Sequence, residues 1–113
     1  MSTNVNISLI VEQLKKINPY KIMLFGSHAY GELNADSDID LLVVTNSDYF
    51  PKNFQEKSDL HLEVSKVLRD IRKRVSIDLV VHTKAMHEKF IELDSMFSKE
   101  ISQNGIVVYE ADN

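Results

Sequence analysis

A chain of 113 residues has the size of one domain, and its content of 43% hydrophobic and 27% charged residues is typical of a globular protein. The apolar runs are too short to cross a membrane, the first residues lack the basic start of a secretory signal, and the absence of Cys excludes disulfides and thiolate metal sites. The net charge of −4 argues against binding of nucleic acid through the overall field. We therefore expect one cytoplasmic domain over residues 1–113, with no membrane partner and at most local contacts with nucleic acid.

The first part of the chain predicts a helix followed by two strands that flank a turn. Apolar residues recur at helical spacing over Ile7–Ile17, and the Asn-Pro pair that follows ends this helix. The apolar segment Lys21–Phe25 predicts a strand, Gly26–Gly31 a turn with a short helical segment, and Asp38–Val44 a second strand.

The second part predicts two further helical regions, each followed by a strand. After a polar loop over residues 45–55, the expected elements are a helix over Ser58–Arg72, a strand over Ser76–His82, a helical stretch over Thr83–Ser102 that is broken once, and a strand over Ile106–Tyr109. Gly105 suits a left-handed cap before the last strand. This order predicts an α+β fold, in which a small mixed β-sheet has helices packed on one face.

Two carboxylates stand together at the start of the second strand. Because side chains of a strand alternate between faces, Asp38 and Asp40 project to the same side, and Ile39 and Leu41 to the other. Two adjacent like charges repel, and a divalent cation that prefers oxygen ligands offsets this repulsion. The pair therefore predicts a Mg²⁺ site, and an acidic turn that only caps the strand is the alternative.

Two further features fit phosphate chemistry at such a site. The Gly26-Ser27 turn leaves a buried strand and offers backbone N–H groups and a hydroxyl to a phosphate. Asp78 interrupts the apolar strand Ile77–Val81, and a lone Asp in such a run is costly to bury without a partner. A strand-edge Asp that reaches water is the alternative for Asp78, and a plain turn is the alternative for Gly26-Ser27.

These segments together resemble the DNA polymerase β-like nucleotidyltransferases, in their minimal single-domain branch. The signature of that superfamily is an apolar residue, Gly-Ser, a gap of about ten residues and Asp-x-Asp, which Phe25-Gly26-Ser27 and Asp38-Ile39-Asp40 match. A third carboxylate on a later strand corresponds to Asp78, and the closing strand pattern corresponds to Gly105–Glu110. The resemblance thus spans nearly the whole chain and implies the polymerase β-like fold.

The resemblance also implies roles for individual residues. Asp38, Asp40 and Asp78 are the expected catalytic residues and metal ligands, with Asp38 and Asp40 holding two Mg²⁺ ions and Asp78 completing the site on the acceptor side. Gly26 and Ser27 are expected to bind the β- and γ-phosphates of ATP.

Three more positions near the turn bear on nucleotide binding. His28 and Tyr30 stand where many relatives carry Arg, so affinity for the triphosphate is expected to be weaker or to depend on pH. His28 and Ser37 are included among the expected nucleotide-binding residues. For Ser37, hydrogen bonds within the local turn are the alternative.

Several other patterns predict less specific roles. The spacing of Asp36, Asp38 and Asp40 is that of the first ligands of a calcium-binding loop, but Leu41 and Ser47 occupy the positions that need Gly and Glu in such a loop. The sequence also lacks the Gly-Lys-Ser/Thr of a Walker phosphate-binding loop. The remaining candidates are a cationic cluster and three histidines. The positive charge of the cluster either interacts favourably with the negative C-terminus of the preceding helix or contacts a substrate. We expect the histidines to be solvated. The cluster comprises Arg69, Arg72, Lys73 and Arg74, and the histidines are His61, His82 and His87.

The sequence therefore predicts a metal-dependent, ATP-binding nucleotidyltransferase that moves a nucleoside monophosphate, AMP in the favoured case, to a hydroxyl acceptor. The minimal branch is typically paired with a small helical HEPN-type protein in toxin–antitoxin modules, so the resemblance implies such a partner as acceptor. The alternative is a non-catalytic antitoxin that neutralises its partner by contact. The base, the acceptor and the oligomeric state stay open at this point.

Overall fold

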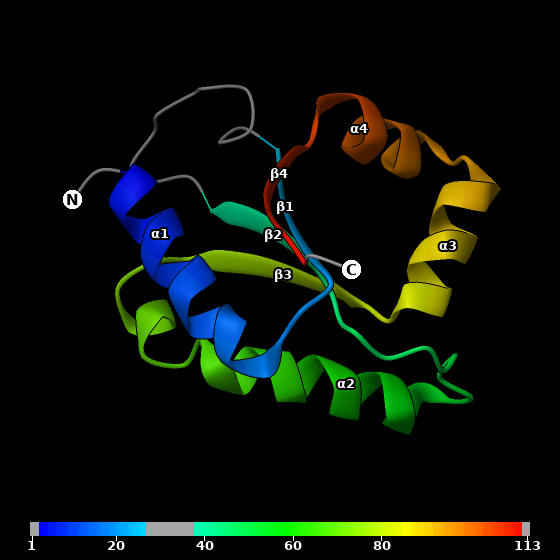
Figure 1. Cartoon of the computed structure of the whole chain (residues 1–113), viewed down its shortest axis with the longest axis horizontal. Coiled ribbons are helices and arrows are strands. Elements are labelled where there is room, and N and C mark those ends of the chain that lie inside the picture. The colour runs from blue at the N-terminus through cyan, green and yellow to red at the C-terminus, as the bar shows by residue number, and fades with distance from the viewer. Residues whose placement is uncertain (1–2, 27–37, 112–113) are drawn as a thin grey trace.

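The computed structural model describes residues 3–26 and 38–111 (Figure 1). Helices and strands alternate along most of this chain, as the sequence predicts. The elements are, in chain order, α1 (Thr3–Leu14), the 3-10 turn η1 (Lys15–Ile17), β1 (Lys21–Phe25), β2 (Ile39–Val44), α2 (Phe54–Val67), the 3-10 turn η3 (Ile71–Lys73), β3 (Ile77–His82), α3 (Lys84–Leu93), α4 (Met96–Asn104) and β4 (Ile106–Glu110).

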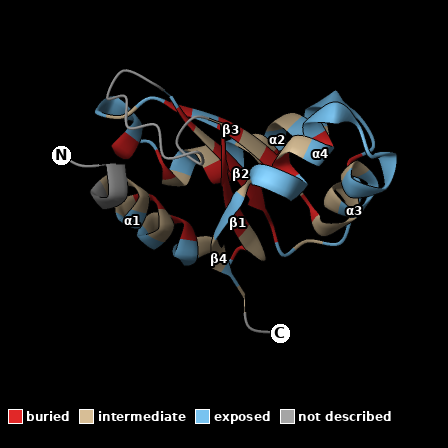
Figure 2. Ribbon diagram, turned by 90° about the horizontal axis from the view of Figure 1, so that it is seen from above, coloured by how far each residue is buried: buried red, intermediate tan, exposed pale blue. Residues whose placement is uncertain are grey.

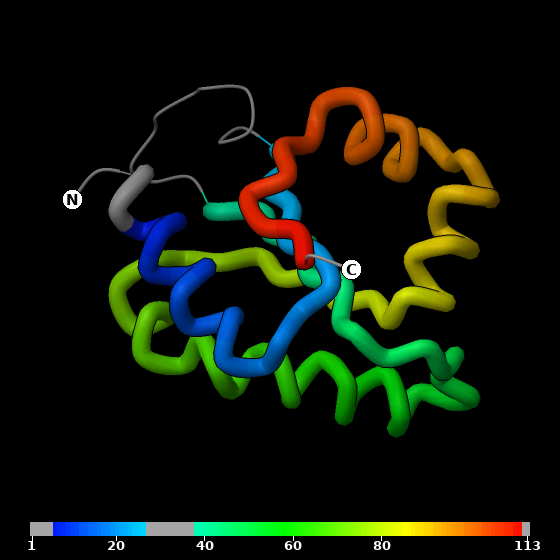
Figure 3. Tube along the Cα trace, viewed as in Figure 1, coloured from blue at the N-terminus to red at the C-terminus, as the bar shows by residue number. Residues whose placement is uncertain are grey.

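The four strands form one mixed sheet in the order β3-β2-β1-β4. The central strand β1 is antiparallel to both β2 and β4, whereas β2 and β3 are parallel and are connected through α2. Figure 3 shows the C-terminal strand beside β1, which joins two segments far apart in the sequence. The predicted mixed sheet and α+β class are confirmed.

Each face of the sheet carries its own apolar core. On the first face, alternate residues of β1, β2 and β3 pack with α1 and α2 around Leu14 and Val64. On the second face, Met23, Phe25 and Leu42 pack with Ile101 of α4 and Phe90 of α3. Figure 2 shows the buried strands between α1 and the α3–α4 pair. The prediction of helices on one face therefore holds for α1 and α2 only, because α3 and α4 present apolar residues to the opposite face.

The ends of the helices differ from the sequence prediction for local reasons. Helix α2 begins before the predicted Ser58, because the Asn53 side chain accepts a hydrogen bond of 2.9 Å from the Glu56 N–H and caps the helix. Between α3 and α4, Asp94 adopts a left-handed conformation with φ of 50° and makes the predicted break. Gly105 is extended, with φ of −68°, so its predicted left-handed cap is wrong. Within the described residues, we find no helix with the length and apolar character needed to cross a bilayer.

Candidate active site

Asp40 and Asp78 occupy directly paired positions on the parallel strands β2 and β3. Residues in register on neighbouring strands project from the same face, and such strands lie about 4.8 Å apart. Because Ile39 and Leu41 belong to the core under α1 and α2, the two carboxylates project from the opposite face. Asp40 is half-buried and Asp78 is exposed. The structure thus brings together two of the three predicted carboxylates, although α2 separates them in the sequence.

Gly26 lies against Asp40, one member of this carboxylate pair. Its φ is 72°, a left-handed value that favours glycine, and a Cβ at this position would clash with Oδ2 of Asp40. The preceding residue, Phe25, is paired with Asp40 across the antiparallel β1–β2 ladder. Gly26 therefore lets the backbone that leaves β1 approach the carboxylate closely, as a phosphate-binding turn requires.

Asp38 lies immediately before β2 and is exposed. The start of that strand is fixed by the Ile39 N–H, which donates a 2.9 Å hydrogen bond to the Ser76 carbonyl. In the part of the chain that the structure describes, however, no three His, Asp or Glu side chains gather closely enough to hold a metal ion. The donors at this site are carboxylate oxygens, and their chemistry fits Mg²⁺. Asp40 and Asp78 are the two carboxylates that lie in register on neighbouring strands.

The remaining nucleotide-binding candidates belong to the segment that follows Gly26. Ser27, His28 and Ser37 lie outside the described residues, as do Asp36 and Tyr30. Their roles stay predictions.

The expectation that the histidines are solvated is wrong for His82 and His87. Their Nδ1 atoms lie 3.1 Å apart, where β3 ends and α3 begins. Burial, with smaller contributions from His87 and Lys57, lowers the pKa of His82 to about 4. Burial, with the charge of Lys21, also lowers the pKa of His87. His61 is half-buried, and its Nε2 lies 3.3 Å from the Leu79 carbonyl oxygen.

A row of aromatic rings leads from the carboxylate pair to these histidines, on the same face of the sheet. Phe25 meets Phe97 edge-on with centroids 5.4 Å apart, Phe97 meets Phe90 at 5.6 Å, and Phe90 meets His82 at 4.9 Å. This row of rings was not predicted from the sequence. Phe90 and Phe97 are seven residues apart, which is a one-face spacing, but the helix breaks between them.

The cationic cluster after α2 contains a structural member. Arg72 donates hydrogen bonds to Oγ of Ser65 at 2.8 Å and to the Ile77 carbonyl at 3.4 Å, which connects the helix to the start of β3. Lys73 forms an exposed ion pair with Asp70, with its Nζ 3.5 Å from Oδ1 of Asp70. These contacts support the structural alternative over a substrate contact for Arg72.

Comparisons with known proteins agree on one family. The sequence profile described as "Nucleotidyltransferase domain" matches residues 6–108. A Methanocaldococcus jannaschii protein with the provisional name protein adenylyltransferase is 33% identical over 97 residues, which cover 81% of this chain and 90% of that protein.

Solved structures of similar fold include a provisionally named nucleotidyltransferase from Sulfolobus solfataricus, with a TM-score of 0.59 and 19% sequence identity. The match covers 94% of this chain and 78% of the Sulfolobus chain. The complex of tri-AMPylated Shewanella oneidensis HEPN toxin with MNT antitoxin matches at a TM-score of 0.50 and 18% identity, over 96% of this chain and 72% of that one. A toxin–antitoxin structure with AMP-PNP matches at 0.52 and 15% identity, over 97% and 75% of the two chains.

Proposed function

This chain belongs to the nucleotidyltransferase domain family, and we propose that it transfers AMP from ATP to a hydroxyl group of a partner protein. The observation that carries the proposal is the position of Gly26 against Asp40, which is in register with Asp78 on the neighbouring strand. A close-approach turn beside two acidic side chains is an arrangement suited to a phosphate and its cation.

Asp40 and Asp78, with Asp38 beside them in the sequence, are the residues that would hold Mg²⁺. When bound, the metal neutralises charge on the triphosphate and lowers the pKa of the attacking hydroxyl. In the transfer, a bond forms between the acceptor oxygen and the α-phosphorus, the bond from that phosphorus to the bridging oxygen of the β-phosphate breaks, and pyrophosphate leaves. The acceptor proton passes to solvent. The family resemblance assigns Asp78 to the acceptor side, and its exposure to solvent is compatible with this role.

A HEPN-type helical protein is the proposed acceptor. Two findings support it: a relative 33% identical carries the provisional name protein adenylyltransferase, and a tri-AMPylated HEPN toxin is bound to an antitoxin of similar fold. We propose that this partner presents the hydroxyl to the site formed by Gly26, Asp40 and Asp78.

The test is to incubate the chain with ATP, Mg²⁺ and the protein product of the reading frame that neighbours its gene, and to measure the intact mass of that product. The expected result is a gain of one or more AMP units, which EDTA prevents. Asp40→Asn and Asp78→Asn should prevent it as well.

A second candidate function is neutralisation of the partner by contact alone. It is favoured by His28 and Tyr30, which stand where many relatives carry Arg and would weaken the binding of the triphosphate. In that case the chain would bind the partner with unchanged affinity after Asp40→Asn and Asp78→Asn, and the partner would gain no mass.

A further inference from the structure

Phe97 exposes its ring beside the candidate active site. Its side chain is 42% exposed, whereas its neighbour Phe25 is 9% exposed and lies under it with ring centroids 5.4 Å apart at 74°. Phe25 is paired with Asp40 and precedes Gly26. Only one buried side chain therefore stands between the Phe97 ring and the backbone that adjoins the carboxylates.

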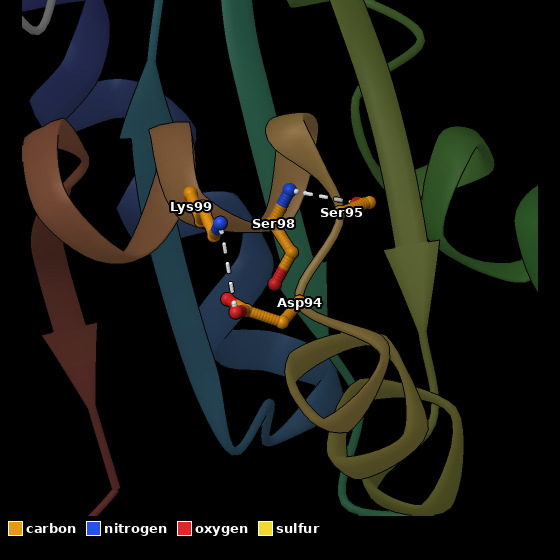
Figure 4. A network of polar contacts seen from close by, with 4 residues as sticks. All are labelled: Asp94, Ser95, Ser98 and Lys99. Carbon is orange, nitrogen blue, oxygen red and sulfur yellow. Dashed lines mark hydrogen bonds and ion pairs between the residues drawn. The ribbon is translucent and has the colours of Figure 1, made fainter.

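The Phe97 ring is held in place from several directions. Phe90 meets it edge-on at 5.6 Å, and the next turn of α4 anchors the helix through Ser98 and Ile101, each 1% exposed. Figure 4 shows the start of α4, where Ser95 Oγ accepts a 3.1 Å hydrogen bond from the Ser98 N–H.

An ion pair closes the same junction. Lys99 Nζ lies 3.7 Å from Oδ2 of Asp94, the residue that breaks the α3–α4 helical region (Figure 4). Met96, the residue before Phe97, is 89% exposed. The junction thus fixes one aromatic ring at the surface while the adjacent apolar side chain points to solvent.

The sheet beside this ring is only partly covered. On the second face of β2, Leu42 and Val44 are both 0% exposed beneath the helices. On the same face of β3, Asp78 is exposed, and Val80 and His82 are only half-buried. Asp78 is therefore the accessible end of this face of β3, whereas Phe90 packs on His82 at the other end.

We infer that the base of the bound nucleotide stacks on the ring of Phe97, with its phosphates at Gly26 and the carboxylate pair. This inference rests on the proposed function. A nucleoside triphosphate combines an anionic end with a flat base, and an exposed aromatic face beside an acidic, cation-binding site complements both parts. Stacking on an aromatic ring tolerates any base, so Phe97 contributes affinity for the nucleoside without selecting adenine.

The test compares Mg²⁺–ATP with Mg²⁺–inorganic triphosphate, which lacks a base, by calorimetry on the full chain. Phe97→Leu keeps the apolar bulk that packs on Phe25 and removes the aromatic face, and Phe97→Trp enlarges that face. Phe54→Ala is the matched control, because Phe54 is 82% exposed at the start of α2. Melting temperatures confirm that each variant is folded.

We expect Phe97→Leu to weaken ATP binding about tenfold, while triphosphate binding is unchanged, because the loss concerns the base alone. Phe97→Trp should bind ATP at least as tightly as the wild type, and Phe54→Ala should change neither ligand. Unchanged ATP affinity in Phe97→Leu, or an equal loss for both ligands, would overturn the inference and leave the proposed function standing. Failure of the wild type to bind either ligand would overturn both. Weaker binding of the partner protein with ATP affinity unchanged would assign Phe97 to a protein interface instead.

Discussion

The Nδ1 atoms of His82 and His87 lie 3.1 Å apart at the junction of β3 and α3. A hydrogen bond at this distance needs one ring nitrogen to donate and the other to accept, so at least one imidazole is neutral. Phe90 covers both rings, with centroids 4.9 Å from His82 and 5.8 Å from His87, and the nearby cations Lys57 and Lys21 disfavour added positive charge. Protonation of this pair therefore opposes the packing of α3 on the sheet.

We predict that the protein loses stability as the pH falls from about 7 to 4, because of His82. The unfolded histidine has a pKa of about 6.5, whereas the folded group has a pKa of about 4. Between these two pH values the unfolded chain binds more protons than the folded chain, so the free energy of unfolding decreases as the pH falls. Above the pKa of the unfolded histidine, the folded protein keeps its full stability with respect to this group. Thermal melts at several pH values measure this dependence.

His82→Leu should flatten the pH dependence of the melting temperature between pH 7 and 5. His61→Gln is the control for the loss of any one histidine, since His61 lies on α2 and contacts the Leu79 carbonyl rather than the pair. An unchanged slope in His82→Leu would show that other groups cause the acid sensitivity.

Gly26→Ala should destabilise the fold by at least about 1 kcal/mol, because alanine is strained where φ is positive. The added Cβ would also meet Oδ2 of Asp40. The two causes can be separated by a double-mutant cycle with Asp40→Ala, measured by urea unfolding. We expect the cost of Gly26→Ala to be smaller in the Asp40→Ala background. Strict additivity would mean that backbone strain alone sets the cost.

Asp78→Asn should raise the melting temperature of the metal-free protein by a few degrees, because it removes a like charge directly opposite Asp40. The gain should disappear at saturating Mg²⁺, which stabilises the wild type by binding only its folded state. Asp48→Asn, which neutralises an exposed carboxylate in the loop after β2, is the matched control. A lower melting temperature for Asp78→Asn in EDTA would instead indicate a structural role for this carboxylate.

Local sequence signals sufficed for the strands and failed for the pairing between distant segments. Strand β1 was predicted with its observed bounds, because a Pro before it and Gly26 after it limit a short apolar run. The register that places Asp40 opposite Asp78 is a property of two parallel strands separated by α2, and neither strand encodes it alone. The His82–His87 contact likewise depends on the angle between β3 and α3.

The sequence pattern also did not predict on which face of the sheet α3 and α4 pack. Their apolar residues are few, and several are exposed at the corner between them, including Leu93 at 67% and Met96 at 89%. Helical periodicity across a break cannot be read as one face, because Asp94 in its left-handed conformation turns the chain. As a result, the contact of Phe97 with Phe25 became visible only in three dimensions.

Arg72→Ala should lower stability by about 1 kcal/mol, the usual value of such hydrogen bonds. The guanidinium connects Oγ of Ser65 on α2 with the Ile77 carbonyl at the start of β3, and both connections are lost. Ile77 directly precedes Asp78 in β3. The loss of these hydrogen bonds would therefore destabilise the strand that carries Asp78 without removing a group of the site itself. We therefore expect the transfer rate per folded molecule to remain near that of the wild type at low temperature.

The control for Arg72 is Arg69→Ala, which removes an exposed charge of the same cluster. If the cluster served to contact the substrate, both variants would raise KM for the acceptor to a similar extent, and the effect would weaken with added salt because exposed charges are screened. If Arg72 is structural, urea unfolding should distinguish the two variants while KM does not. Arg72→Lys sharpens the comparison, since lysine keeps the charge but lacks the planar fork that reaches Ser65 and Ile77 at once. It should therefore resemble Arg72→Ala in stability and the wild type in its salt dependence.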